Sequence, residues 1–386
     1  MRRHLALGLT TTALLVCTPV ISHATEPDTE CAIGKRSSTG PQPTSEQREY
    51  RERLHSLATG KDVKVAVIDT GVAQHEQLRK LEGGADFVTP DDPGPHFDCD
   101  VHGTVVAGII GSKDLGLAPD AQLRSIRQSS AHYRQPDNEE EEAIAGAGSV
   151  ATLADAIHDA VDHDADIINV SVVSCVPQEL NDAVDLSPLH HAAGRAEDKG
   201  ALIVAASGNA AEAGCQASDI VYPAALDTVL AVGAMANDYD LAEYSISADG
   251  VVAPGHVPLG LSPQGWATAK SMPQGAGHED AEFHGTSFAA PIVSGTSAIL
   301  AERHPDASPA ELRELLLSAA EPGHGVIDPL ATLSHQPADY AVEEEALQLR
   351  PAVQESNVAR HRAGIIAAGC AVLLGLAAIW RGLRRR

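Results

Sequence analysis

Short apolar runs that alternate with helical patterns constrain the fold of this chain most strongly. Val63–Asp69 is a nearly continuous apolar run that ends at Asp69 and Gly71, as a strand buried on both faces of a parallel sheet would. Three similar runs follow at Gln122–Arg127, Asp166–Val173 and Leu202–Ala206. Between them, apolar residues recur at helical spacing over 150–161, and 189–199 forms a weaker helical pattern. This order predicts an α/β fold with a doubly wound, mostly parallel sheet flanked by helices.

Composition agrees with that fold class. The 386 residues are enough for one large domain, and abundant glycine and alanine with few aromatics favour tightly packed α/β layers over a β-sandwich. Further short strands are expected at Val229–Ala234 and Gly250–Ala253. Ser308 and Glu311 form a capping box that opens a helix through Leu317.

The charge balance excludes one class of partner. The net charge is −26, and the stretch between the two basic ends holds 53 acidic residues against 19 basic ones. A domain so acidic repels nucleic acid, and no nucleic-acid partner is predicted.

Both ends of the chain carry membrane signals. Residues 1–24 combine a basic start, an apolar run from Leu5 to Ile21 and small residues before a cut after Ala24, which is typical of a secretory signal peptide. Residues 363–380 hold no charge and are long enough to span a bilayer, and 381–386 is a basic cytoplasmic tail. By the positive-inside rule the chain is a single-pass protein of the cell membrane, attached through its C-terminal helix, with its domain extracytoplasmic.

The remaining segments divide the chain further. Residues 25–61 are polar and lack a core, which predicts an N-terminal arm with a helix around Ser45–Leu57; 62–333 form the α/β domain and 334–362 an acidic stalk. Ser129–Gly148 is a charged stretch with four consecutive glutamates, and we interpret it as a solvated surface loop. A regulatory or partner-binding role for this loop is the alternative.

Four cysteines lie outside the two membrane signals: Cys31, Cys99, Cys175 and Cys215. An even number in an oxidising compartment predicts two disulfides, and the sequence leaves three pairings open. Their wide spacing does not resemble that of a zinc site.

Four polar residues near the expected carboxyl ends of strands or at helix starts are individually weak signals. Asp69 occurs in an Asp-Thr-Gly turn, His102 opens a helix of small residues, and Asn209 follows a strand. Ser287 is expected at the first turn of a helix of small apolar residues, where a serine more commonly serves only as a cap. Together they supply a carboxylate, an imidazole, a hydroxyl and an amide donor for an oxyanion, which is what serine hydrolysis requires.

The blocks around these residues resemble the subtilisin-like serine peptidases. Those blocks are Val67–Gly71, His102–Gly108, Ala206–Asn209 and Gly285–Pro291, and the resemblance extends over about residues 63–333. It implies Asp69, His102 and Ser287 as a catalytic triad and Asn209 as the oxyanion donor. Ser207 stands where many relatives have alanine or glycine. Val172-Val173 stands where secreted subtilisins often have Leu-Gly, at an edge that lines the substrate groove in the family. This second departure argues against a broad range of substrates.

Within that family the chain resembles the mycosins, the membrane-anchored proteases of type VII secretion systems. The similarity lies in Phe97–Asp100, Leu123–Ser130 and Asn169–Cys175, together with the arm that carries Cys31 and the single C-terminal span. It implies the disulfides Cys31–Cys99 and Cys175–Cys215, and an arm that wraps the domain instead of blocking its cleft. The first pair also agrees with the residues themselves, since it would fix a coreless arm beside the active site.

The expected function is therefore an outward-facing, membrane-anchored serine endopeptidase that cleaves protein or peptide substrates without a cofactor. A mainly structural role in the membrane complex of a type VII secretion system is the alternative. Calcium often stabilises subtilisin-like folds, and Asp86, Asp91, Asp92, Asp98 and Asp100 could bind it. Exposed acidic loops are common in so acidic a chain, however, and no metal is predicted.

Overall fold

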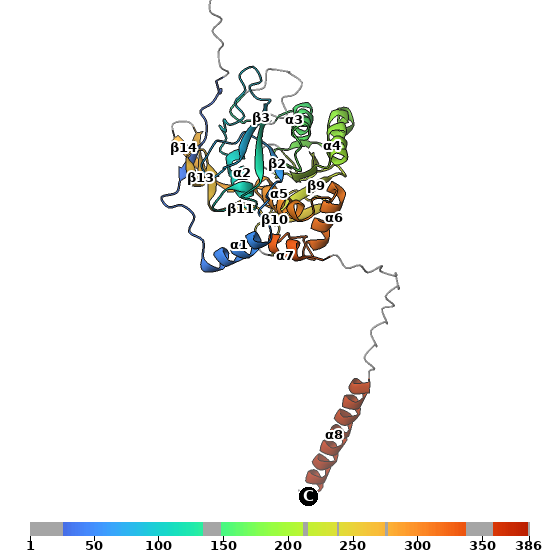
Figure 1. Cartoon of the computed structure of the whole chain (residues 1–386). Helices are drawn as coiled ribbons and strands as arrows, with labels where there is room; N and C mark the ends of the chain where they lie inside the picture. Colours follow the sequence, from blue (N-terminus) through green and yellow to red (C-terminus); the bar gives the residue numbers. More distant parts are fainter. Residues whose placement is uncertain are drawn as a thin grey trace, which may run out of the picture. The chain divides into compact units, whose positions relative to one another are not determined.

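A computed structural model of the chain describes residues 26–133, 148–210, 215–237, 239–274, 277–336 and 358–384 (Figure 1). The predicted signal peptide, most of the acidic loop and much of the predicted stalk lie outside these residues. The chain divides into two compact units, Met1–Pro337 and Ala338–Arg386, which we describe separately.

The first unit contains a sheet of seven strands in the order β10-β9-β7-β5-β2-β4-β3, and every neighbouring pair is parallel. This confirms the predicted fold class. Its strands are β2 (Lys64–Asp69), β3 (Leu81–Asp86), β4 (Gln122–Arg127), β5 (Ile167–Val170), β7 (Leu202–Ala206), β9 (Val229–Met235) and β10 (Gly250–Pro254).

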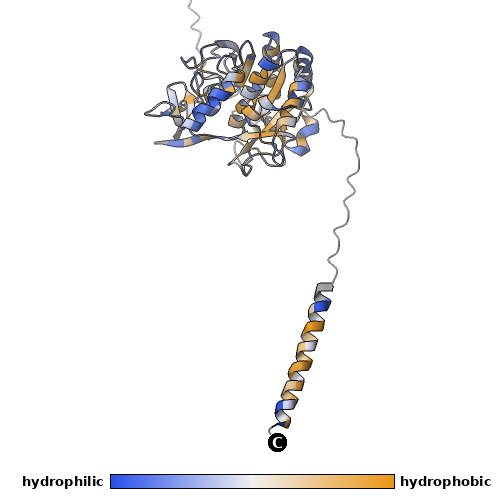
Figure 2. Cartoon of the chain, turned by 60° about the horizontal axis from the view of Figure 1, so that its bottom comes forward, coloured by the Kyte–Doolittle hydropathy of each residue, from blue (hydrophilic) through white to orange (hydrophobic). Residues whose placement is uncertain are grey.

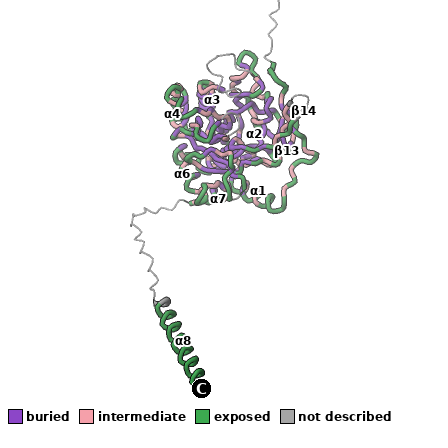
Figure 3. The backbone as a smooth tube through the Cα atoms, turned by 180° about the vertical axis from the view of Figure 1, so that it is seen from behind, coloured by how far each residue is buried: buried purple, intermediate pink, exposed green. Residues whose placement is uncertain are grey.

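Helices cover both faces of this sheet, because successive side chains of a strand point to opposite faces. On one face Val65 and Val67 of β2 join the core that includes α2 (Gly103–Gly111) and α5 (Thr286–Arg303). On the other face Ala66 and Ile68 pack with α3 (Val150–Asp162) and α4 (Ser187–Lys199), which lie side by side in Figure 1. Figure 3 shows this buried interior as a continuous zone beneath exposed helices and loops.

The predicted strand Asp166–Val173 is too long. Strand β5 ends at Val170, where Asn169 Nδ2 donates to Ser171 Oγ at 2.9 Å, and the chain then leaves the sheet. It forms β6 (Ser174–Val176), which pairs with β8 (Ile220–Tyr222) in a separate antiparallel ladder. Between β6 and β8 the chain forms a 3-10 helix, Gln178–Ala183, then α4 and the sheet strand β7.

The predicted arm packs on the rest of the first unit along most of the arm's described length. Its strand β1 (Ile33–Arg36) pairs with β13 (Gly265–Gln274), which pairs in turn with β14 (Gly277–His284); β11 (His256–Val257) and β12 (Gly260–Ser262) complete this second sheet. Its helix α1 (Ser45–Leu57) buries Leu54, and the hydroxyl of Tyr50 donates to Asp328 Oδ2 at 2.8 Å. Asp328 caps α7 (Pro329–Ser334), which follows α6 (Pro309–Ala319) and its capping box.

The second unit contains α8 (Val358–Leu383), which runs beyond both ends of the predicted span. Residues His361–Leu383 have a mean hydropathy of 2.2 and are long and apolar enough to cross a membrane. Figure 2 shows hydrophobic residues along the middle of this helix and hydrophilic residues toward its ends.

Candidate active site

Asp69 and His102 meet at the carboxyl edge of the parallel sheet. Asp69 ends β2 with a fully buried side chain, and its Oδ1 lies 2.6 Å from Nδ1 of His102, the residue that precedes α2. A side-chain carbon at Gly103 would lie 2.1 Å from the carbonyl oxygen of Gly71, so only glycine lets α2 approach the strand this closely. The local sequence thus brings the carboxylate and the imidazole into hydrogen-bond contact.

The environment of His102 favours its charged form. Burial, the largest single effect, lowers the pKa of the imidazole, but the charge and the hydrogen bond of Asp69 together outweigh it, and the pKa of His102 is raised above its usual value. Lys270 opposes this rise and Asp98 adds to it. His102 keeps 17% of its side chain exposed, so the imidazole remains accessible from outside.

Thr286 orients the amide of Asn209. Asn209 Oδ1 accepts hydrogen bonds from the backbone N–H and the hydroxyl of Thr286, both at 3.0 Å. Because these bonds fix the amide oxygen, Nδ2 points away from Thr286. A side-chain carbon at Gly285 would lie 3.0 Å from Asn209 Nδ2 and 3.5 Å from Ser287 Oγ. These two atoms therefore border the same small space, and Gly285 keeps that space open.

Ser287 lies in the first turn of α5 and does not cap it. The helix begins at Thr286, and its capping position is Gly285, which has no side chain. The backbone N–H groups of this first turn have no partner within the helix, and the helix dipole is positive there. The next residue, Phe288, places its ring centroid 5.0 Å from that of His102. Through Phe288, the structure thus brings the first turn of α5 against the imidazole of His102.

The structure contains the disulfides Cys31–Cys99 and Cys175–Cys215, the pairs that the family resemblance implies. The first joins the arm to the segment just before His102. The second ties β6 to the segment that precedes β8. The hydroxyl of Ser207, a departure from many relatives, donates to the carbonyl of Ile246 at 2.8 Å and so has a structural partner.

Three of the five carboxylates considered as calcium ligands, Asp86, Asp98 and Asp100, accept hydrogen bonds from other groups of the chain. Asp86 accepts from backbone N–H groups, from Thr89 and from the guanidinium of Arg127. Asp100 accepts from Ser130 and from the backbone of Ala131. Asp98 binds the turn after β2 and the start of α2, a role that sequence reasoning missed. Asp98 lies five residues before the first helical residue, Gly103, and so outside the usual capping position, and no local signal marks its role.

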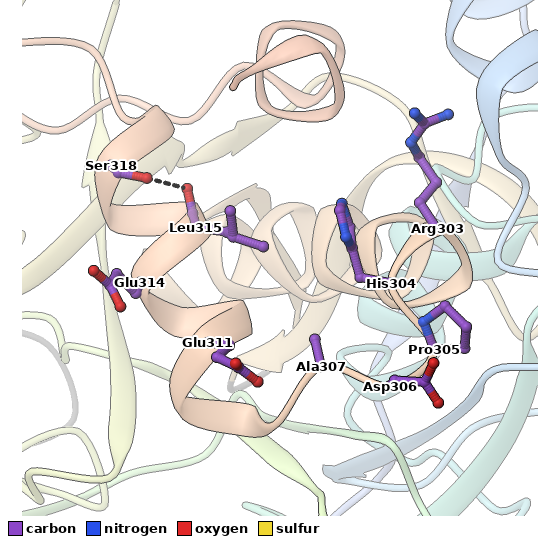
Figure 4. A pocket seen from close by; sticks show the side chains of 9 residues that line it. All are labelled: Arg303, His304, Pro305, Asp306, Ala307, Glu311, Glu314, Leu315 and Ser318. Atoms are coloured by element: carbon purple, nitrogen blue, oxygen red, sulfur yellow. Dashed lines mark hydrogen bonds between the residues drawn. The ribbon is translucent and has the colours of Figure 1, made fainter. Parts of the chain in front are cut away.

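A cavity of about 660 Å³ lies elsewhere in the first unit, where the end of α5 meets α6 (Figure 4). Arg303 and His304 line one side and Glu311 and Glu314 of α6 line the other. Helix α5 has 18 residues, so its ends are about 27 Å apart, and this cavity is separate from the Ser287 end.

Comparisons with known proteins agree with this geometry. A family model described as the subtilase family matches residues 60–353. Mycosin-4 of Mycobacterium tuberculosis is 36% identical over 316 residues, covering 73% of this chain and 67% of the relative. The crystal structure of MycP1 from the ESX-1 type VII secretion system superposes with a TM-score of 0.71 at 30% identity, covering 82% of this chain and 92% of that one. A chain of the intact ESX-5 inner membrane complex gives a TM-score of 0.70 at 29% identity, covering 92% and 94%.

Proposed function

Because the chain belongs to the subtilase family and is a mycosin-like serine endopeptidase, we propose that Asp69, His102 and Ser287 form its catalytic triad. The 2.6 Å contact between Asp69 Oδ1 and His102 Nδ1 is the observation that carries this proposal. A carboxylate that accepts the Nδ1 proton fixes the tautomer in which Nε2 is free to act as a base.

The reaction then proceeds through an acyl-enzyme. Ser287 Oγ attacks the peptide carbonyl carbon while Nε2 of His102 takes the hydroxyl proton, and Asp69 stabilises the resulting imidazolium. His102 next protonates the leaving amine, the peptide bond breaks, and an ester joins Ser287 to the acyl half. Water attacks that ester with His102 as base, which releases the acid and restores the serine.

Asn209 stabilises the oxyanion that forms in both steps. Its Nδ2 borders the same space as Ser287 Oγ, while its oxygen is held by Thr286. The backbone N–H of Ser287, in the first turn of α5, supplies a second donor, and the helix dipole adds to the stabilisation. Both donors are in place before the negative charge develops, so little reorganisation is needed.

The enzyme acts on protein or peptide substrates at the outer side of the cell membrane. Residues 1–24 are removed as a signal peptide, and α8 anchors the chain in the membrane. The apolar stretch His361–Leu383 supports this anchor, and the basic tail supports the orientation. A chain of the ESX-5 inner membrane complex covers 92% of this chain, which supports membership in a type VII secretion complex.

The same likeness to a chain within an assembled complex favours a second function, a structural subunit of the complex with proteolysis secondary. Secretion and complex integrity, compared between a deletion strain and a Ser287→Ala strain, separate the two functions. Catalysis is the essential contribution if the Ser287→Ala strain behaves like the deletion. Normal assembly and secretion in the Ser287→Ala strain would assign the essential role to the scaffold.

Proteolysis itself is tested with the purified full-length chain in detergent and an unfolded protein as substrate. We expect cleavage by the wild type and by Ser318→Ala, a matched control on α6, and none by Ser287→Ala. Equal cleavage by all three would contradict the proposed triad.

A further inference from the structure

A second buried carboxylate, Asp98, lies behind the contact between Asp69 and His102. Its residue is only 7% exposed. We propose that Asp98 is a positioning residue of the active site, which holds the start of α2 against the turn after β2 and so fixes His102 relative to Asp69. This inference rests on the proposed triad.

The hydrogen bonds of Asp98 join the two elements that deliver the acid and the imidazole. Oδ1 accepts from the Thr70 hydroxyl at 2.8 Å and from the backbone N–H of His102 at 3.3 Å. Oδ2 accepts from the backbone N–H and the hydroxyl of Thr104, at 2.9 and 2.6 Å. Thr70 follows Asp69 directly and Thr104 lies two residues after His102, so one carboxylate binds a neighbour of each catalytic group.

The backbone before His102 needs such support. Val101 has φ of +54°, a left-handed conformation that is strained for a β-branched residue. Its neighbours hold it there: Cys99 is bonded to Cys31 of the arm, and Asp100 accepts from Ser130 Oγ at 2.6 Å. His102, at the capping position of α2, makes no side-chain cap bond, and Asp98 instead accepts from the backbone N–H groups of His102 and Thr104.

Thr70 also links the two carboxylates. Its single hydroxyl proton faces Asp98 Oδ1 at 2.8 Å and Asp69 Oδ1 at 3.2 Å, while its oxygen accepts from the N–H of Gly103 at 3.0 Å. The Thr70 hydroxyl can therefore donate to either Asp98 or Asp69, and it donates to whichever carboxylate carries the negative charge. A change at Asp98 alters the hydrogen bonding of Asp69 without touching it.

The charge of Asp98 also affects the pKa of His102. Burial, opposed by the Thr104 and Thr70 bonds and helped by Asp100, raises the pKa of Asp98 to about 6. When ionised, Asp98 raises the pKa of His102, as Asp69 does, whereas Lys270 on β13 lowers it. Loss of the Asp98 charge therefore lowers the pKa of His102, a shift that a loss of packing alone would not produce.

The test compares Asp98→Asn with the wild type in the full-length chain. The carboxamide puts an N–H group where only donors converge, so α2 shifts, and we expect kcat to fall by roughly 100-fold, the effect of displacing a catalytic group by about 1 Å. The acid limb of kcat/KM against pH should move to lower pH. Asp166→Asn removes a half-buried carboxylate that accepts from the Lys64 N–H at the opposite edge of the sheet, and it should change neither quantity.

A lower melting temperature with unchanged kcat and an unchanged acid limb would overturn the inference and leave Asp98 a simple helix cap. If Asp98→Asn does not fold, Thr70→Val and Thr70→Ser decide the question. The valine variant removes the hydroxyl link and should lose activity, while serine restores the hydroxyl and should recover most of it. Equal activity of both would also overturn the inference. A wild type without Ser287-dependent activity would instead reject the proposed function itself.

Discussion

Nδ1 of His102 lies 2.6 Å from Oδ1 of Asp69, and the two side chains differ sharply in exposure. The carboxylate is fully buried at the end of β2, while the imidazole keeps 17% of its surface exposed at the start of α2. Strand β2 of the parallel sheet holds Asp69, and the start of α2 holds His102 at the edge of the site.

Asp69→Asn should leave the fold intact and reduce kcat by about 10⁴-fold, because an amide can donate to Nδ1 and so stabilise the wrong tautomer. The measurement is steady-state proteolysis by the purified full-length chain, with circular dichroism to verify folding. A folded variant that retains a tenth of the wild-type kcat would show that Asp69 does not orient the base.

The activity should depend on pH through His102. The neutral imidazole is the base, so kcat/KM falls as the pH drops through the pKa of His102 in the free enzyme. Since Asp69 raises that pKa despite burial, the acid limb should have its midpoint above the ordinary value of about 6.5. A midpoint at or below that value would contradict the described electrostatics.

Asn209→Ala should lower kcat by roughly 10²–10³-fold with little change in KM, as expected when one oxyanion donor is removed. It also removes the acceptor for Thr286. Asn209→Asp is the sharper variant, because it keeps an acceptor for Thr286 and replaces only the donor with an anionic oxygen. We expect it to lose at least as much activity as the alanine variant. Activity near the wild-type level in Asn209→Asp would exclude Nδ2 as the donor.

Replacing Cys31 and Cys99 together by serine should destabilise the first unit. The bond closes a sequence separation of 68 residues, and a chain-entropy model gives about 4 kcal/mol for its contribution to the free energy of unfolding. Activity should fall as well, because Cys99 lies between Asp98 and the strained Val101. Denaturant unfolding and proteolysis measure the two effects, with Cys370→Ser, a free cysteine in α8, as the neutral control. Unchanged stability and activity in the double variant would show that the arm is not fixed by this bond.

Much of the parallel sheet could be predicted from the sequence. Strands β4 and β7 begin and end at the predicted residues. Each is a short run of mostly buried residues, and the apolar pattern stops clearly at its end. The second sheet was missed, because β13 and β14 are rich in polar residues, and β1 reaches β13 only through a long-range contact. No local period reveals such a pairing.

The four proposed site residues were recognisable because each stands in a short motif and their order along the chain is informative. The sequence indicates Asp98 only as a possible calcium ligand and as part of the motif Phe97–Asp100. Its function depends on three partners, Thr70, His102 and Thr104, and on the positive φ of Val101. These are properties of the folded turn, and residue types alone do not reveal them.

The most direct test of the triad is to map the adduct of a serine-directed fluorophosphonate by mass spectrometry in the full-length chain. We predict a single modified serine, Ser287, in the wild type and in Ser318→Ala, no adduct in Ser287→Ala, and strongly slowed labelling in His102→Ala. Labelling of Ser287→Ala at the wild-type rate, or an adduct on a different serine, would contradict the assignment of Ser287 as the nucleophile.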